Sequence, residues 1–180
     1  MPIASPHLVK PGKTVHIDKL PTDSIGAFKD KDDALKATQK NLKRLAELQE
    51  LIYAESKHAV LVVLQATDTG GKDGAINFVF TGINPQECRV ESFKAPSTLE
   101  RSHDYLWRIH MRCPARGMIG IFNRSHFEDV LITRVLKVID TKTAHRRFRQ
   151  INDFERMLSE EGTTILKFFL HISKDEQRER

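Results

Sequence analysis

A strand followed by a glycine-containing loop, a lysine and a helix is the feature that most constrains the fold of this chain. Residues 59–64, Ala-Val-Leu-Val-Val-Leu, form an apolar, β-branched run that predicts a strand buried on both faces of a parallel sheet. The run ends in a polar loop with Gly70 and Gly71, and after Lys72 the apolar residues take a helical spacing. Glycines let backbone N–H groups turn towards an anion, and the helix N-terminus and the lysine add positive charge. The segment therefore predicts a phosphate-binding loop at the carboxyl end of a strand.

The match to the standard phosphate-loop pattern, G-x-x-x-x-G-K-[ST], is partial. Gly71 and Lys72 fit the pattern. Ala66 stands in place of the first glycine, and Asp73 stands in place of the hydroxyl residue that would hold magnesium. Asp68 adds a carboxylate inside the loop, which is compatible with phosphate if a divalent cation lies between the two. The alternative interpretation is an ordinary strand–turn–helix with a capped helix start.

The composition is that of one globular domain, long enough at 180 residues to bury a core. The net charge of +5 favours a polyanionic partner such as a nucleotide, polyphosphate or nucleic acid, and is equally compatible with simple solubility. There is no run of 18 apolar residues and no apolar signal-peptide core in residues 1–13, so we expect no membrane partner. Cys88 and Cys113 have no metal-ligand or disulfide spacing, so we expect reduced thiols in the cytoplasm.

The rest of the chain divides into an irregular N-terminal arm, residues 1–30, and an α/β domain, residues 31–180. The arm holds four of the seven prolines. The domain begins with an amphipathic helix over 31–57, whose leucine stripe we expect to pack on the core, with a partner subunit as the alternative. Further elements follow in order: strands over 88–93, 118–122 and 163–170, and helices over 98–112, 126–139, 144–161 and from 174 onwards.

Polar side chains follow the predicted strands at the rim where open parallel sheets bind ligands. Lys94 follows the second strand, so it is expected on the same rim as Lys72. Asn123 and Arg124 follow the third strand, where phosphoryl-transfer folds usually present an acid to the metal, and Arg124 can neutralise phosphate charge. The nearest acid, Glu128, begins a helix, where a carboxylate also stabilises the helix dipole.

The predicted helix over 98–112 carries His103 and Trp107, which are four residues apart and share a face, with Arg108 one position further round. A polar helix whose apolar side chains enter the core is the alternative interpretation of this stretch. His103 and His110 have no third ligand nearby, so the sequence does not predict a zinc site here.

Seven segments of the chain carry a family resemblance. The first is the loop Gln-Ala-Thr-Asp-Thr-Gly-Gly-Lys-Asp-Gly over 65–74, and the fifth is Ile-Phe-Asn-Arg-Ser-His-Phe-Glu-Asp-Val-Leu over 121–131. The others are residues 82–86, 92–96, 103–108, 150–155 and 168–174. Together they resemble the family-2 polyphosphate kinases, in order, over about residues 15 to 180. So many collinear segments are more specific than one glycine loop.

The resemblance implies a three-layer α/β/α P-loop kinase fold of the thymidylate-kinase type with a central parallel sheet. It implies Mg²⁺-dependent, reversible transfer of phosphoryl groups between inorganic polyphosphate and adenine nucleotides. It also implies a homo-oligomer, either a dimer or a tetramer. Asn123 and Glu128 are similar to the subfamily that phosphorylates both nucleoside mono- and diphosphates.

The resemblance also implies roles for individual residues. The residues implied in catalysis are Asp68, Lys72, Arg124 and Glu128, of which Asp68 and Glu128 are the implied metal ligands. Phosphate binding is implied for Thr69, Gly70, Gly71, Lys72, Asp73, Gly74 and Lys94. Contacts with the nucleotide or substrate are implied for His103, Trp107, Arg108, Asn123 and Arg124.

One feature departs from the family pattern. Family members usually continue into an arginine-rich lid, and this chain ends at Arg178-Glu179-Arg180, where the lid is expected to begin. Closure of a lid contributes to the rate of phosphoryl transfer. The alternatives are therefore a non-catalytic polyphosphate- or nucleotide-binding core and a P-loop kinase that acts between nucleotides. No nucleic-acid partner is expected, because no recognised module is present.

Overall fold

A four-stranded parallel sheet is the centre of this computed structural model, which describes residues 7–180. Its strands, in the spatial order β2-β3-β1-β4, are β1 (Ala59–Ala66), β2 (Cys88–Ser92), β3 (Ile119–Asn123) and β4 (Thr163–Leu170). β1 pairs with β3 on one side and with β4 on the other, so the glycine-loop strand lies inside the sheet. All four predicted strands are confirmed, with their ends shifted by one or two residues at most.

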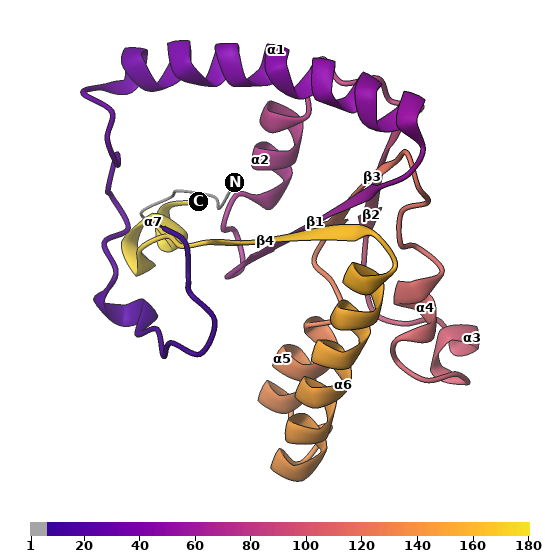
Figure 1. The fold of residues 1–180 in the computed structure, drawn as a ribbon. Coiled ribbons are helices and arrows are strands. Elements are labelled where there is room, and N and C mark those ends of the chain that lie inside the picture. The colour runs from indigo at the N-terminus through magenta and orange to yellow at the C-terminus, as the bar shows by residue number, and fades with distance from the viewer. Residues whose placement is uncertain (1–6) are drawn as a thin grey trace.

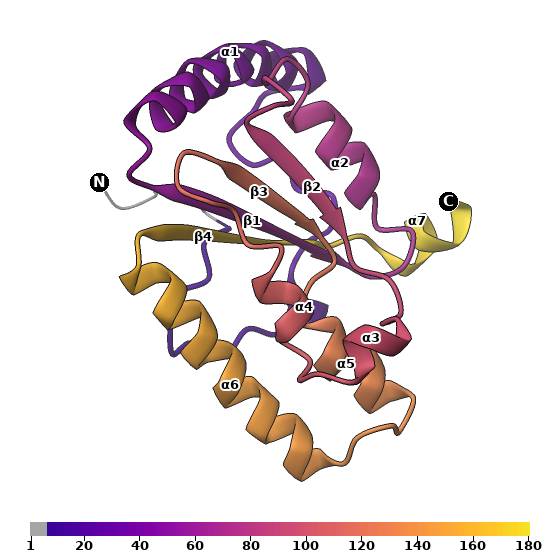
Figure 2. The same cartoon turned by 90° about the vertical axis from the view of Figure 1, so that its right-hand side faces the viewer.

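Helices cover both faces of the sheet, as Figures 1 and 2 show. One face carries α1 (Lys31–Glu55) and α2 (Lys72–Val79). The other carries α3 (Thr98–Arg101), α4 (Trp107–His110), α5 (Glu128–Val135) and α6 (Thr141–Glu160). The connection from β1 to β2 crosses the sheet in the opposite direction to the later ones, so right-handed crossovers put α2 and α3–α6 on opposite faces. The predicted three-layer α/β/α fold is confirmed.

The side chains of β1 show why the strand is apolar throughout. Leu61 and Val63 enter the core beneath α4 and α6, whereas Val62 and Leu64 enter the core beneath α2. All four side chains are buried, and each contributes about 1.5–3 kcal/mol of burial free energy. The alternation across two covered faces fixes the register of β1, because a slip of one residue would exchange the two cores.

The predicted helix over 98–112 is wrong: the structure has two short helices, α3 and α4, with a break between them. Ser97 starts α3 with a reciprocal capping box to Glu100. The Asp104 carboxylate then accepts hydrogen bonds from the backbone N–H groups of Leu106 and Trp107, at 3.0 and 3.1 Å. Aspartate in this turn competes with the helical hydrogen bonds, and for that reason the helix restarts at Trp107.

The predicted leucine stripe of α1 is covered only in part. Leu42, Leu45 and Ile52 are half-buried, whereas Leu35 and Leu48 are 38% and 40% exposed. The buried residue of α1 is Gln49. The Gln49 side chain exchanges two hydrogen bonds with the backbone of Asn84, at 2.9 and 3.0 Å, and these bonds attach α1 to the turn before β2. The predicted cap of α1 is confirmed, because Asp30 accepts a hydrogen bond from the Asp33 N–H.

Two later helices differ from the prediction at their ends. The predicted 126–139 helix is α5, which ends at Val135 before Lys137 takes a left-handed conformation with φ of 54°. The predicted 144–161 helix is α6, which starts earlier, because Asp140 caps it. Residues 7–30 contain a single 3₁₀ turn, Ile17–Lys19, and residues 1–6 of the predicted arm lie outside the described residues. Among residues 7–180, no helix has the length and apolarity needed to cross a bilayer.

Candidate active site

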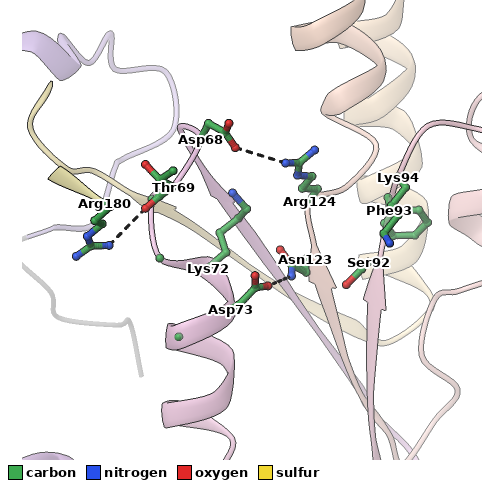
Figure 3. A pocket seen from close by; sticks show the side chains of 13 residues that line it. Asp68, Thr69, Lys72, Asp73, Ser92, Phe93, Lys94, Asn123, Arg124 and Arg180 are labelled. Atoms are coloured by element: carbon green, nitrogen blue, oxygen red, sulfur yellow. Dashed lines mark hydrogen bonds and ion pairs between the residues drawn. The ribbon is translucent and has the colours of Figure 1, made fainter. Parts of the chain in front are cut away.

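The loops after β1, β2 and β3 meet around a pocket of about 620 Å³ at the carboxyl edge of the sheet (Figure 3). The loop after β1 leads to α2 on one face, whereas the loop after β3 leads to α5 on the other. Adjacent strands whose connections leave to opposite faces create a crevice between them, and open α/β sheets bind their ligands there. The sheet order therefore places the pocket at the glycine loop.

The two glycines of the loop are both required by its geometry. A Cβ atom on Gly70 would lie 2.4 Å from the Cβ of Ala66 and 2.9 Å from the carbonyl oxygen of Thr67. Gly71 has a φ of 84°, in the left-handed region that favours glycine, and it is the N-cap of α2. The next residue is Lys72, so the lysine and the N-terminus of α2 face the same pocket. This is the local geometry of a phosphate-binding loop.

Two polar contacts join the glycine loop to the loop after β3. The Asn123 amide donates a hydrogen bond to the Asp73 carboxylate, and Arg124 lies 3.7 Å from the Asp68 carboxylate. Both pairs border the pocket in Figure 3. The Asp68 side chain is 84% exposed, so its carboxylate is open to a cation or to solvent.

Hydrogen bonds to β1 hold the loop that follows β3. Arg124 has a φ of 64°, a sparsely populated region for a residue other than glycine. Its N–H donates to the Leu64 carbonyl at 3.2 Å. The next residue, Ser125, is fully buried and accepts a hydrogen bond from Gln65 at 2.9 Å. These contacts to β1 fix the direction in which the Arg124 guanidinium leaves the sheet.

The structure brings most of the sequence-predicted site residues together. The pocket is lined by Asp68, Thr69, Gly70, Gly71, Lys72, Asp73, Gly74, Lys94, Asn123 and Arg124, all of which the sequence singled out. Sequence reasoning missed Ser92, Phe93 and Arg180, which also line it. With Arg180 included, four cationic side chains and two carboxylates surround the pocket, so it has a positive balance suited to an anion.

Arg108, predicted to contact the substrate, lies apart from the residues that line the pocket. Its guanidinium is 7% exposed and lies outside the pocket lining, where it donates to the Lys94 carbonyl at 2.8 Å and pairs with Asp129 at 3.2 Å. It also stacks over the Phe93 ring, 5.6 Å from the ring centroid. The N–H groups of the guanidinium and one of its faces are therefore engaged by the protein, and Arg108 supports the loop that carries Lys94.

The remaining predicted site residues also lie outside this pocket. The rings of His103 and Trp107 stack on each other with centroids 4.1 Å apart, and Trp107 lines a second pocket of about 400 Å³ with His110 and Phe154. Glu128 is the first residue of α5 and does not line the pocket of Figure 3. The second carboxylate of that pocket is Asp73.

The carboxylate groups of the pocket fit magnesium only in combination with a phosphate ligand. Among residues 7–180, no group of three or more histidine, cysteine, aspartate or glutamate side chains is arranged to hold a metal ion. Mg²⁺ is usually held by one or two carboxylates together with substrate phosphates and water. The exposed Asp68 carboxylate beside the glycine loop meets that requirement.

The fold and the pocket together define a protein with the P-loop kinase fold, whose candidate site lies at the carboxyl ends of β1 and β3. The chain belongs to the polyphosphate kinase 2 family: residues 28–180 match the family model described as Polyphosphate kinase 2 (PPK2). It is 53% identical over 173 residues to the AMP/ADP-polyphosphate phosphotransferase of Meiothermus ruber, an alignment that covers 96% of this chain. It is 45% identical over 181 aligned residues, 94% of this chain, to the ADP-polyphosphate phosphotransferase of Rhodopseudomonas palustris.

A solved structure agrees with the family assignment. The crystal structure of polyphosphate kinase 2 from Arthrobacter aurescens TC1 superposes with a TM-score of 0.90 and 44% sequence identity over 96% of this chain. The chain spans 65%, 63% and 62% of the lengths of these three relatives, a little less than two thirds in each case.

Proposed function

We propose that this chain transfers phosphoryl groups, in either direction, between inorganic polyphosphate and the adenine nucleotides AMP and ADP. The observation that carries the proposal is the pocket, in which a glycine loop, Lys72, Lys94 and Arg124 meet at one rim of the sheet. The names of the Meiothermus and Rhodopseudomonas relatives, both polyphosphate phosphotransferases that act with AMP or ADP, support polyphosphate as one substrate and a nucleotide as the other. Asn123 and Glu128, where the chain resembles the subfamily with both activities, support AMP and ADP as alternative acceptors.

In this mechanism the protein positions two anions and stabilises the charge between them. Lys72, the loop amides and the N-terminus of α2 bind phosphate oxygens. Arg124, held at its backbone by Leu64, stabilises negative charge on the transferred group. The acceptor is already an ionised phosphate oxygen, so the reaction needs no strong general base, and alignment of the two substrates supplies much of the rate.

Asp68 is the residue we assign to magnesium, with Glu128 as a second carboxylate acting through water from the start of α5. When bound, Mg²⁺ neutralises charge on the phosphate oxygens and orients them. Asp68 is already paired with Arg124 at 3.7 Å, so this carboxylate and this guanidinium are placed to act on the same phosphate. The Asn123 amide donates a hydrogen bond to the Asp73 carboxylate and so holds it at the border of the pocket.

A substrate panel tests this function against its rivals. The chain is offered AMP or ADP with magnesium and either polyphosphate or ATP as the phosphoryl donor, and the nucleotides formed are separated and measured. The proposal expects ADP and ATP as products with the polyphosphate donor. Transfer from ATP alone would identify a nucleotide-to-nucleotide kinase. Polyphosphate binding without any product would identify a non-catalytic core.

We also propose that the chain self-associates and works in the cytoplasm. Exposed apolar side chains on α1, among them Leu48, Leu51 and Tyr53, support a second copy as the partner of this helix. Sedimentation equilibrium tests the proposal: the double variant Leu48→Glu/Leu51→Glu should lower the mass of the wild-type oligomer, and a wild-type monomer would refute it. The free thiols of Cys88 and Cys113 support a reducing compartment.

A further inference from the structure

The short helix after the last strand lies against the glycine loop, more than a hundred residues away in sequence. This helix, α7 (Lys174–Glu179), begins at Ser173, whose side chain accepts a hydrogen bond from the Glu176 N–H. Figure 1 shows it beyond the carboxyl end of β4, on the side of the sheet where the chain leaves β1. A helix of six residues is not stable by itself, so α7 depends on what it packs against.

Gln177 of α7 contacts the loop through both its side chain and its backbone. Its side-chain amide donates to the carbonyl oxygen of Asp68 at 3.0 Å. Its own carbonyl oxygen accepts a hydrogen bond from the Thr69 hydroxyl at 3.3 Å. Asp68 and Thr69 are consecutive residues, so Gln177 holds the peptide group between them through two hydrogen bonds.

Thr69 is the residue of the loop that most needs external support. Its φ is 57°, a left-handed conformation that a β-branched residue adopts only under constraint. The two residues that follow, Gly70 and Gly71, make the turn that leads into α2. A residue in such a conformation persists where the surrounding structure holds it in place. For Thr69, α7 supplies hydrogen bonds to the preceding carbonyl oxygen and to the Thr69 hydroxyl.

Arg180, just beyond α7, adds a third contact to the same segment. Its guanidinium lies 3.5 Å from the Thr69 carbonyl oxygen and is oriented by Glu176 at 2.7 Å. A Cβ on Gly71 would lie 2.8 Å from Arg180 Nη1, so the end of this side chain lies directly against the glycine loop. Figure 3 shows Arg180 on the opposite side of Thr69 from Lys72.

We propose that Gln177 is a positioning residue, which holds the Asp68–Thr69 peptide and thereby keeps the phosphate loop in its anion-binding shape. Gln177 does not line the pocket, so it acts through the loop and not on the substrate. Coupling of this kind is reciprocal: if α7 stabilises the binding shape of the loop, an anion bound in the loop stabilises α7. The part of the inference that concerns the anion rests on the proposed function, whereas the part that concerns the shape of the loop does not.

Amide hydrogen exchange, read residue by residue by NMR in the ligand-free chain, tests the inference directly. The Gly70 N–H donates to the Thr67 carbonyl within the loop, and the Gln177 N–H donates to Ser173 within α7, so both report local opening. In Gln177→Ala, both amides should exchange about threefold to tenfold faster, the factor that the loss of one net hydrogen bond gives. Gln177→Glu puts a carboxylate against the Asp68 carbonyl oxygen, so its effect should be at least as large.

Arg178→Ala is the matched control, because Arg178 lies on the same helix, is 81% exposed and pairs only with Asp175 among the residues that the structure describes. Its exchange rates in the loop should equal those of the wild type. Unchanged Gly70 exchange in both Gln177 variants would overturn the inference, and so would an equal acceleration in Arg178→Ala.

The second measurement is the affinity for inorganic tripolyphosphate with magnesium, by titration calorimetry. The wild type should bind, both Gln177 variants should bind about threefold to tenfold more weakly, and Arg178→Ala should bind like the wild type. Unaltered affinity in the Gln177 variants would overturn a positioning role. If the wild type did not bind tripolyphosphate, the proposed function would fail, and the exchange rates would still decide whether Gln177 holds the loop.

Discussion

Gly70 and Gly74 lie four residues apart in the glycine loop and its helix, but their surroundings differ. A Cβ at Gly70 would collide with Ala66 and Thr67, whereas a Cβ at Gly74 meets no heavy atom within 4 Å. Gly74 also lies inside α2, where glycine is a poor helix former. Ala66 therefore fits in place of the first glycine of the loop pattern because Gly70, which faces it, has no side chain.

The two glycines should respond in opposite directions to substitution by alanine. Gly70→Ala forces a backbone shift and should lower the free energy of unfolding by about 1–3 kcal/mol. Gly74→Ala should raise it by about 0.5–1 kcal/mol, because alanine favours the helix. Urea denaturation of both variants checks the prediction, and destabilisation of the same size in both would contradict it.

Arg108 and Asp129 form a buried ion pair, with side chains 7% and 13% exposed. Removal of one partner leaves the other charge buried without compensation, so Arg108→Ala should cost about 3–5 kcal/mol of unfolding free energy. Arg156→Ala is the control, because Arg156 is 64% exposed and its ion pairs are on the surface. A variant that bound nucleotide poorly but unfolded like the wild type would restore Arg108 as a substrate contact.

The rim residues could be predicted from the sequence, whereas Arg108 and Arg180 could not. Lys94, Asn123 and Arg124 each follow a strand, and the carboxyl ends of parallel strands share one rim. Arg108 pairs with an aspartate 21 residues away, a contact that local spacing does not reveal. Arg180 reaches the pocket because β4 ends beside β1, which depends on the strand order.

At the scale of elements, one network of polar side chains, from buried His126 to half-exposed Lys167, joins the segment after β3 to α6 and β4. His126 is fully buried and its Nε2 lies 3.2 Å from the Glu155 carboxylate on α6, which also accepts from Lys167 of β4 at 2.5 Å. His126 Nδ1 has no hydrogen-bond partner among the described residues, so Nε2 makes the ring's hydrogen bond, to Glu155. The network ties the segment that carries Arg124 to two distant elements.

The Glu155 network makes stability depend on pH. Burial alone raises the pKa of Glu155, but hydrogen bonds from His126 and Lys167 and the charge of Lys167 outweigh it, so this pKa lies below its ordinary value of 4.5. The unfolded chain then binds the proton more readily. The stability contributed by ionised Glu155 is therefore fully present above pH 4.5 and is lost as the pH falls through the lower, folded-state pKa.

Glu155→Gln should consequently lower the free energy of unfolding by about 1–3 kcal/mol at pH 7. The difference from the wild type should shrink as the pH falls below 4.5. Glu160→Gln on the same helix is the control, because its side chain is 71% exposed and its pairing with Arg156 is on the surface. Urea denaturation across the pH range checks both variants, and a difference independent of pH would contradict the ionised network.

The helices show where local pattern fails as a guide. The break between α3 and α4 depends on the Asp104 side chain binding backbone N–H groups, which competes with a spacing that is otherwise helical. The apolar stripe on α1 predicts an amphipathic helix, but the sequence does not say what covers the stripe. In the structure Leu42 and Leu45 are half-buried, whereas Leu48 stays exposed. Hydrophobic periodicity predicts that a helix forms, but it does not predict which part of the molecule packs against the apolar face of that helix.

For the whole molecule, the layers could be predicted and the strand order could not be derived from local pattern. Strands apolar at every position require cover on both faces, and β1 has two cores beside it. The order β2-β3-β1-β4 was not predicted, because it depends on which strands pair and not on the pattern within any one strand. That order matters for function, because it puts the loops after β1 and β3 side by side and makes Lys72 and Arg124 neighbours.

The central claim is that phosphoryl transfer from polyphosphate occurs at the glycine loop. The measurement is the rate of ADP and ATP formation from AMP, ADP, polyphosphate and magnesium, for the wild type, Lys72→Ala and the exposed α1 control Lys36→Ala. We expect product from the wild type and from Lys36→Ala, and a rate at least about a hundredfold lower in Lys72→Ala with unchanged unfolding, because a charge aimed at the transferred group is lost. Wild-type turnover that survives in Lys72→Ala would contradict the claim and move the reaction to another part of the molecule.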